Sequence, residues 1–264
     1  MLELKKSLGQ NLLVDENIIN KISDLDSIKN KTIFEIGPGT GNLTQSILKK
    51  NPGKVLLIEK DKRLCKILID KFNLKKNYNI FNEDILKFDI NPNEHIDVIF
   101  GNLPYNISTQ ILARFIKFKK WPPSFKKIIF MFQKEVADRI LAKPYSKDFG
   151  RLSVLSNFRL SVVESFKVSK NCFFPKPKID SKVIVFKPKS NTDYKIKDIK
   201  NLEKITQIFF SGKRKMINKA FSKLFSNYKS TAEILNIDLN KRPSELNYHD
   251  YYKITEYYEK NNLI

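Results

Sequence analysis

Residues 32–59 read TIFEIGPGTGNLTQSILKKNPGKVLLIE, and this stretch decides the fold class. The apolar run at 32–36 is typical of a buried strand, and the glycine-rich segment 37–41 indicates a tight turn. Apolar residues then recur at helical spacing over 42–48, and a second apolar run follows at 55–59. Strand, turn, helix and strand in this order predict a unit of two parallel strands joined by a crossover helix.

The same alternation continues along the chain. Further apolar runs, separated by amphipathic stretches, predict strands at 78–81, 96–100 and 128–132. Because these runs are almost continuously apolar, we expect an α/β fold with a parallel sheet and helices on both faces. Asp15 is expected to cap an N-terminal helix. Two more strands, at 152–160 and 182–186, are predicted as an antiparallel pair at one edge.

A second, smaller domain is predicted after a polar, proline-containing segment at 187–191. Beyond it, apolar residues recur only at helical spacing, and the remainder is rich in Tyr and Lys. We therefore expect an α/β domain at 1–188 and a small all-helical domain at 189–264.

Composition excludes several classes of protein. With 264 residues and 41% hydrophobic residues the chain can bury a full core. It has no run of about 18 apolar residues that could span a membrane, and its first residues do not resemble a signal peptide. Two cysteines and two histidines provide neither a disulfide framework nor a metal site. We expect a cytoplasmic protein without metal.

The charge points to a polyanionic partner. Lys and Arg number 49 against 28 Asp and Glu, for a formal net charge of +21. Binding to nucleic acid releases condensed counterions, so a strongly basic chain suits such a partner. Only seven of these cations are arginine, and part of the lysine excess is what an AT-rich genome produces.

The glycine turn and the acidic residues near it predict a cofactor site. Gly37 and Gly39 allow a ligand to approach the backbone, and Glu59 follows the next strand, where it can accept ribose hydroxyls. The glycine spacing of this turn differs from that of the dinucleotide-binding fingerprint. Glu35, Glu59 and Asp84 lie at the ends of three successive strands and suit a cationic sulfonium, so S-adenosylmethionine is favoured. The alternatives are a plain tight turn and, for Asp84, a helix cap.

Asn102-Leu103-Pro104-Tyr105 is the most specific motif and follows the strand at 96–100. The N6 atom of adenine is a poor nucleophile because its lone pair is delocalised into the ring. The side-chain carbonyl of Asn102 and the main-chain carbonyl of Leu103 can each accept an N6–H bond and favour a pyramidal nitrogen. Pro104 stiffens the turn and Tyr105 can stack on the base. The motif predicts methyl transfer to adenine, with a simple turn as the alternative.

With these motifs the chain resembles the ribosomal RNA adenine dimethyltransferases, closest to the branch that acts on the bacterial small subunit. The resemblance covers essentially the whole chain. Leu12 and Lys213 stand where the family more often has Phe and Arg. The matching segments are Lys5–Asn11, Glu35–Thr44, Asn102–Ser108, Gln133–Ala137, Phe149–Ser153 and Phe173–Ser181.

The resemblance implies a Rossmann-like class I methyltransferase sheet and a C-terminal helical domain that recognises RNA. It implies an aromatic clamp of Tyr105 and Phe173 and phosphate contacts by Lys213-Arg214-Lys215. The alternatives are a core position for Phe173 and a solvated helix face for the basic run, and Phe174 is expected in the core. The implied catalytic residues are Asn102, Leu103, Pro104, Tyr105 and Phe173. The implied S-adenosylmethionine-binding residues are Asn11, Leu13, Gly37, Gly39, Glu59, Asp84 and Asn102.

The implied substrate is a pair of adjacent adenosines in a hairpin near the 3′ end of small-subunit (16S) ribosomal RNA. Each is dimethylated at N6 during biogenesis of the small subunit, by an enzyme that we expect to be a monomer. Two alternatives stay open: a large-subunit methyltransferase of the macrolide-resistance type, and a mainly non-catalytic RNA-binding assembly factor. A nicotinamide-dependent oxidoreductase is excluded because the third fingerprint glycine is missing.

Overall fold

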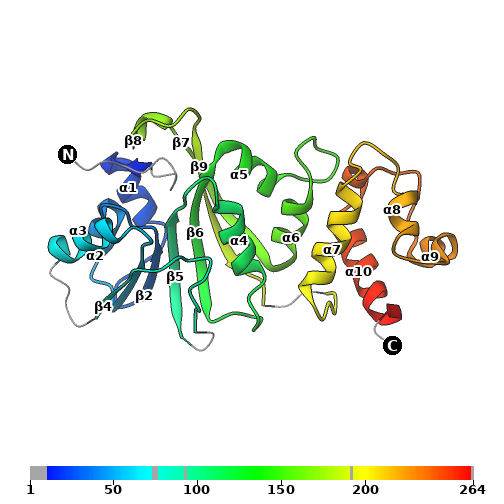
Figure 1. The fold of residues 1–264 in the computed structure, drawn as a ribbon, viewed down its shortest axis with the longest axis horizontal. Helices are drawn as coiled ribbons and strands as arrows, with labels where there is room; N and C mark the ends of the chain where they lie inside the picture. Colours follow the sequence, from blue (N-terminus) through cyan, green and yellow to red (C-terminus); the bar gives the residue numbers. More distant parts are fainter. Residues whose placement is uncertain (1–10, 73–76, 92–93, 191–192, 263–264) are drawn as a thin grey trace. The chain divides into compact units, whose positions relative to one another are not determined.

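The computed structural model describes residues 11–72, 77–91, 94–190 and 193–262 (Figure 1). They divide into two compact units. The first, here called the sheet unit, contains the described residues up to Ala137 together with Val162–Pro188. The second, the helical unit, contains Asp138–Ser161 and the described residues from Lys189 onward. The motif residues at 5–10 lie outside the described residues.

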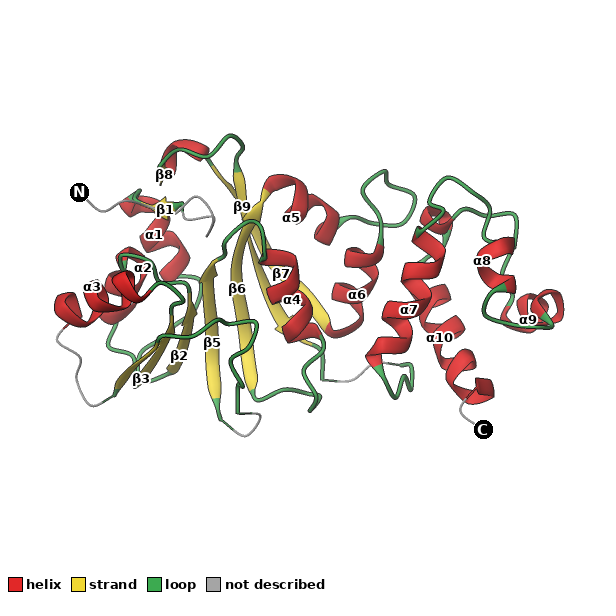
Figure 2. Ribbon diagram, viewed as in Figure 1, coloured by secondary structure: helices red, strands yellow, loops and turns green. Residues whose placement is uncertain are grey.

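The described part of the sheet unit is built around a seven-stranded sheet (Figure 2). Neighbouring strands from β4 to β6 are parallel, and β9 joins β6 antiparallel. Pairing of Ile36 with both Ile58 and Gly101 brings the carboxyl ends of β2, β3 and β5 to one edge. In order across the sheet, the strands are β4 (Tyr78–Phe81), β3 (Lys54–Ile58), β2 (Thr32–Ile36), β5 (Ile96–Asn102), β6 (Phe125–Gln133), β9 (Ser181–Pro188) and β7 (Leu160–Val168).

Helices pack on both faces of this sheet, because adjacent strand residues point to opposite sides. Met131 joins a buried cluster with Ile22 and Ile47, whereas its neighbour Phe130 contacts Phe115 edge-on, with ring centroids 5.6 Å apart. The predicted α/β fold is confirmed. The helices are α1 (Glu16–Ser23), α2 (Asn42–Leu48), α3 (Lys62–Phe72), α4 (Ser108–Ile116) and α5 (Lys134–Leu141), whose last turn begins the helical unit.

A small antiparallel sheet ties the N-terminal segment to the chain before β9. It consists of β1 (Leu12–Leu13) and β8 (Phe173–Phe174), and a 3-10 turn, η2 (Lys170–Cys172), precedes β8. Asp15 caps α1 as predicted, accepting the main-chain N–H of Ile18 at 2.9 Å.

The strand predicted at 152–160 is wrong: residues Arg151–Arg159 form helix α6, and β7 begins at Leu160. Val154 and Phe158 are four residues apart and both buried, which is helical spacing. A short run of mixed apolar and hydroxyl residues satisfies both periods, so periodicity alone could not distinguish them. The strand predicted at 182–186 is confirmed within β9.

The helical unit packs around aromatic side chains. Tyr251 is fully buried, stacks on Phe210 with ring centroids 5.6 Å apart, and contacts Phe209 edge-on. Tyr252 donates its hydroxyl to the carbonyl oxygen of Val154, so α6 belongs to this unit, whereas the predicted boundary at 188/189 left it in the first domain. The unit's other elements are α7 (Ile199–Phe210), α8 (Asn218–Ser222), α9 (Tyr228–Leu235), the 3-10 turn η3 (Pro243–Glu245) and α10 (Tyr248–Asn262).

Candidate functional site

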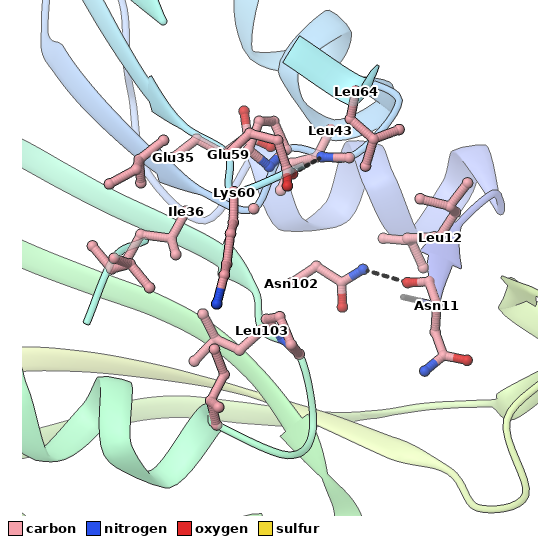
Figure 3. A pocket seen from close by; sticks show the side chains of 18 of the residues that line it. Asn11, Leu12, Glu35, Ile36, Leu43, Glu59, Lys60, Leu64, Asn102 and Leu103 are labelled. Atoms are coloured by element: carbon pink, nitrogen blue, oxygen red, sulfur yellow. Dashed lines mark hydrogen bonds between the residues drawn. The ribbon is translucent and has the colours of Figure 1, made fainter. Parts of the chain in front are cut away.

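A cavity opens at the carboxyl edge of the parallel strands (Figure 3). This edge is where open α/β sheets bind ligands, because the loops diverge there. The cavity is lined by five parts of the sheet unit that are far apart in the sequence: 11–13, 35–40 with 42–43, 58–60, 83–85 and 102–107, with Leu64 in addition. It therefore gathers the predicted cofactor residues and the Asn102–Tyr105 motif around one space.

The glycine turn forms one wall of this cavity. Gly39 has a φ of +61°, and an added Cβ would lie 2.9 Å from Cδ2 of Leu12. Gly37 also has a left-handed φ, of +65°, and its N–H bonds the carbonyl oxygen of Ile58 at 2.9 Å. Both positions thus require the conformational freedom of glycine, and the bare backbone lets a ligand approach closely.

Glu59 is held beside the turn by main-chain N–H groups. Its carboxylate accepts from Gly39 at 3.2 Å (Figure 3). It also accepts from Asp61 at 2.8 Å. Burial raises its pKa, while these two bonds oppose the rise. The carboxylate is therefore fixed in orientation at the end of β3 and keeps lone pairs that can accept ligand hydroxyls.

Glu35 lies beneath the turn and differs from the other acidic residues. It is buried and accepts a 2.7 Å bond from Oγ1 of Thr44 on α2. Burial raises its pKa to about 7, with a smaller contribution from the charge of Glu59. Because Glu35 is close to half-protonated at neutral pH, three full negative charges do not face the cavity. Thr44 was missed from sequence, where a helical threonine carries no distinctive pattern.

Asp84 lies at the cavity on the loop after β4. It pairs with Nζ of Lys60 at 2.8 Å and accepts the main-chain N–H of Leu86 at 2.9 Å. The bond from Lys60 is the main reason that the pKa of Asp84 is lowered. The alternative for Asp84, a helix cap, is wrong: a turn and no helix follows it, and the bond to Leu86 closes that turn while Asp84 also lies in the cavity wall. Lys60, which also lines the cavity (Figure 3), was missed from sequence.

Asn102 ends β5 with its amide held in one orientation. Its Nδ2 donates to the carbonyl oxygen of Asn11 at 3.0 Å (Figure 3). No residue in the described part of the chain donates to the other amide atom, Oδ1. Leu103 and Pro104, which follow, also line the cavity. The site therefore presents an acceptor oxygen whose orientation is set by the N-terminal segment.

Tyr105 lines the same cavity and is anchored by its hydroxyl. The hydroxyls of Tyr105 and Ser181 share a hydrogen bond of 2.7 Å, and burial raises the pKa of the tyrosine. Ser181 begins β9, so a residue 76 positions away in sequence sets the orientation of the ring. No sequence pattern pointed to this anchor.

The structure does not place Phe173 at the cavity. Its side chain is 4% exposed within the cluster that contains Ile19 and Leu13, whereas Phe174 is 64% exposed. The predicted aromatic clamp with Tyr105 and the predicted core position of Phe174 are both corrected. Phe173 pairs with the buried Leu13, and successive strand residues point to opposite faces, so Phe174 points outward.

Among the described residues, no helix is long and apolar enough to cross a membrane. The described residues also contain no group of three or more His, Cys, Asp or Glu that could hold a metal ion. Lys213, Arg214 and Lys215 are exposed in the helical unit, between α7 and α8.

The sequence profile of the family described as Ribosomal RNA adenine dimethylase matches residues 1–260. The chain is 47% identical over 256 residues to "Ribosomal RNA small subunit methyltransferase A" of Pelagibacter ubique, covering 97% of each chain. It is 40% identical over 248 residues to the protein of the same name from Mycoplasmopsis synoviae, covering 92% of each.

Two solved structures are similar over nearly their whole length. A dimethyladenosine transferase from Plasmodium falciparum superposes with a TM-score of 0.78 at 26% identity, covering 95% of this chain and 98% of the other. The 23S rRNA methyltransferase ErmE superposes with a TM-score of 0.69 at 21% identity, covering 93% and 98%. The second likeness concerns the fold alone.

Proposed function

Because the chain belongs to the ribosomal RNA adenine dimethylase family, we propose that it dimethylates N6 of two adjacent adenosines in small-subunit ribosomal RNA. The methyl donor is S-adenosylmethionine. The observation that carries the proposal is the orientation of Asn102, whose Nδ2 is engaged by Asn11 so that Oδ1 is the atom left to accept an amine. The names of the two bacterial relatives support the small subunit as the source of the RNA.

The residues around the cavity fit the methyl donor. The turn at Gly39 leaves room that a Cβ would fill, and Glu59 is held ready to accept two ribose hydroxyls. Asp84 is proposed to face the base of the donor, and Asn11 and Leu13 to close the cavity from the N-terminal side. When bound, S-adenosylmethionine supplies an electrophilic methyl group.

The chain's own contribution to the reaction is positioning and charge stabilisation. Oδ1 of Asn102 and the main-chain carbonyl of Leu103 accept the two N6–H bonds and direct the nitrogen lone pair toward the donor. Tyr105 holds the base by its ring face. Such preorganised acceptors stabilise the positive charge that develops on N6. No protein base is required, because the methylated nitrogen is acidic enough to release its proton to water.

The partner is proposed to be the RNA of the immature small subunit, met by a monomeric enzyme in the cytoplasm. A net charge of +21 supports an RNA partner. The helical unit is proposed to recognise RNA, with its exposed Lys213-Arg214-Lys215 contacting phosphates.

The test is to incubate the chain with labelled S-adenosylmethionine and, separately, immature small subunits and large subunits. Mass spectrometry of the digested RNA should show two adjacent dimethyladenosines in the small-subunit RNA alone. Label in large-subunit RNA would favour the alternative substrate, and binding without label would favour an assembly factor.

A further inference from the structure

Tyr145, in the helical unit, is an aromatic residue whose side chain lies on the surface. Its side chain is 70% exposed, the highest value among the large apolar and aromatic side chains exposed in the described residues. Its backbone has a φ of +68°, a left-handed conformation that non-glycine residues seldom adopt. Such a conformation persists only where the surrounding structure imposes it. Tyr145 is therefore held in this position by its neighbours.

The loop around Tyr145 is anchored on both sides. The main-chain N–H of Tyr145 donates to the carbonyl oxygen of Ser244 at 2.7 Å, and Tyr248 donates its hydroxyl to the carbonyl oxygen of Ala142 at 2.8 Å. At the other end Phe149 is fully buried against Tyr248, with ring centroids 5.4 Å apart. The loop thus presents the ring from a fixed backbone, which reduces the entropy lost when a ligand contacts it.

Three basic segments meet at this loop. Nζ of Lys213, between α7 and α8, donates to the carbonyl oxygen of Lys147. Ser244, whose carbonyl accepts from Tyr145, lies within η3, and the N-cap of η3 is Arg242. Glu245 bonds the main-chain N–H of Arg242. The exposed cations of the three segments are Lys143, Lys147, Lys213, Arg214, Lys215 and Arg242.

We propose that Tyr145 is a stacking platform for an unpaired RNA base, with phosphates held by the surrounding cations. Proteins bind single-stranded RNA by combining aromatic faces on which bases stack with basic side chains along the backbone. The loop at Tyr145 supplies both an aromatic face and basic side chains. It is separate in sequence from the Asn102 motif. This proposal depends on the proposed function in one respect, namely that RNA is the partner.

Two variants of Tyr145 distinguish the contribution of its ring from that of the loop backbone. Tyr145→Asn removes the ring but keeps a residue that tolerates the left-handed conformation, and Tyr145→Phe keeps the ring face. Ile234→Ala is the matched control, because Ile234 is 67% exposed on α9 of the same unit and is not aromatic. Equal thermal unfolding midpoints for all three variants establish that each is folded.

The probe is a short single-stranded oligoadenylate that carries one 2-aminopurine, measured by fluorescence anisotropy at several salt concentrations. Tyr145→Asn should weaken binding by roughly tenfold at every salt concentration, since stacking is not ionic. Its salt slope should match that of the unchanged chain, and Tyr145→Phe and Ile234→Ala should bind normally. Quenching of the 2-aminopurine should be lost with Tyr145→Asn alone.

Normal binding and quenching by Tyr145→Asn would overturn the stacking platform, whether or not the chain methylates adenosine. A change in salt slope instead of a uniform loss would also overturn it, because the effect would then be ionic. Conversely, a chain that shows the predicted binding but transfers no methyl group would contradict the proposed function and leave the platform supported.

Discussion

The side-chain amide nitrogen of Asn102 donates a 3.0 Å hydrogen bond to the main-chain carbonyl oxygen of Asn11. An amide can be oriented in two ways, and this bond selects the one in which Oδ1 is the available atom. The last residue of a central strand is thereby coupled to the segment before α1. The acceptor that the proposed reaction needs is thus in position before any RNA binds.

Replacing Asn102 tests this orientation. Asn102→Ala should slow single-turnover methyl transfer by roughly 10²–10³-fold, because an acceptor that matters most in the transition state is lost. Asn102→Asp should be nearly as slow, since a carboxylate cannot donate to the carbonyl of Asn11. RNA affinity, measured by filter binding, should stay within about twofold in both, because it depends on many phosphate contacts. Near-normal rates for Asn102→Ala would show that N6 is held elsewhere.

Substitutions at Tyr105 and Ser181 should separate the role of the tyrosine ring from the role of the hydrogen bond that anchors it. Tyr105→Ala is expected to weaken both capture of the base and the transfer rate, because the ring face is gone. Tyr105→Phe and Ser181→Ala each remove one side of the 2.7 Å hydroxyl bond and should cost about 1 kcal/mol of stability with mild effects on rate. In a double-mutant cycle the two losses should not add, and full additivity in urea unfolding would contradict the shared bond.

Glu59→Ala should mainly weaken binding of S-adenosylmethionine. Charged-acceptor bonds contribute about 1.5–3 kcal/mol each, so the affinity measured by calorimetry should fall at least tenfold. Glu94→Ala is a suitable control, because this carboxylate pairs with Lys54 and is not among the cavity-lining residues. Unchanged affinity in a folded Glu59→Ala variant would remove Glu59 from the site.

Glu35 should make stability depend on pH in an identifiable range. Its pKa is about 7 in the folded chain against an ordinary 4.5, so the folded state binds more protons between these values. The stability it contributes is present below about pH 4.5 and is lost as the pH rises through about 7, by about 3 kcal/mol. Glu35→Gln should abolish this component of urea unfolding free energy. A parallel pH dependence in both proteins would contradict the raised pKa.

RNA binding should weaken steeply with salt, whereas binding of S-adenosylmethionine should not. For single-stranded RNA the logarithm of affinity should fall by about 0.7 per phosphate contacted for each unit of log salt. Lys213→Gln, Arg214→Gln and Lys215→Gln should each reduce that slope. A flat response to salt would mean that the lysine excess is compositional and forms no binding surface.

The strand pattern around residues 32–59 and the glycine turn were readable from sequence because they are local. A buried parallel strand needs a continuous apolar run, and a left-handed turn needs glycine, so each leaves its mark on a few neighbouring residues. The type of element was predicted wrongly at Arg151–Arg159. This short segment fits both the helical and the strand period, and tertiary packing decides between them. The seven-residue motif at Asn102–Ser108 could also be recognised from sequence, because its residues are contiguous.

What the sequence by itself determined is therefore the fold class, the residues of the glycine turn and the Asn102 motif, and through them the family. Only the tertiary structure decided that Asn102 bonds Asn11, that Tyr105 bonds Ser181, and that Phe173 is buried while Phe174 is exposed. The reason is physical: these outcomes depend on which main-chain or side-chain atoms meet across strands distant in sequence. A one-residue change of register reverses which side chain faces inward, and because residues 173 and 174 are both Phe, the local pattern could not show which of them is buried.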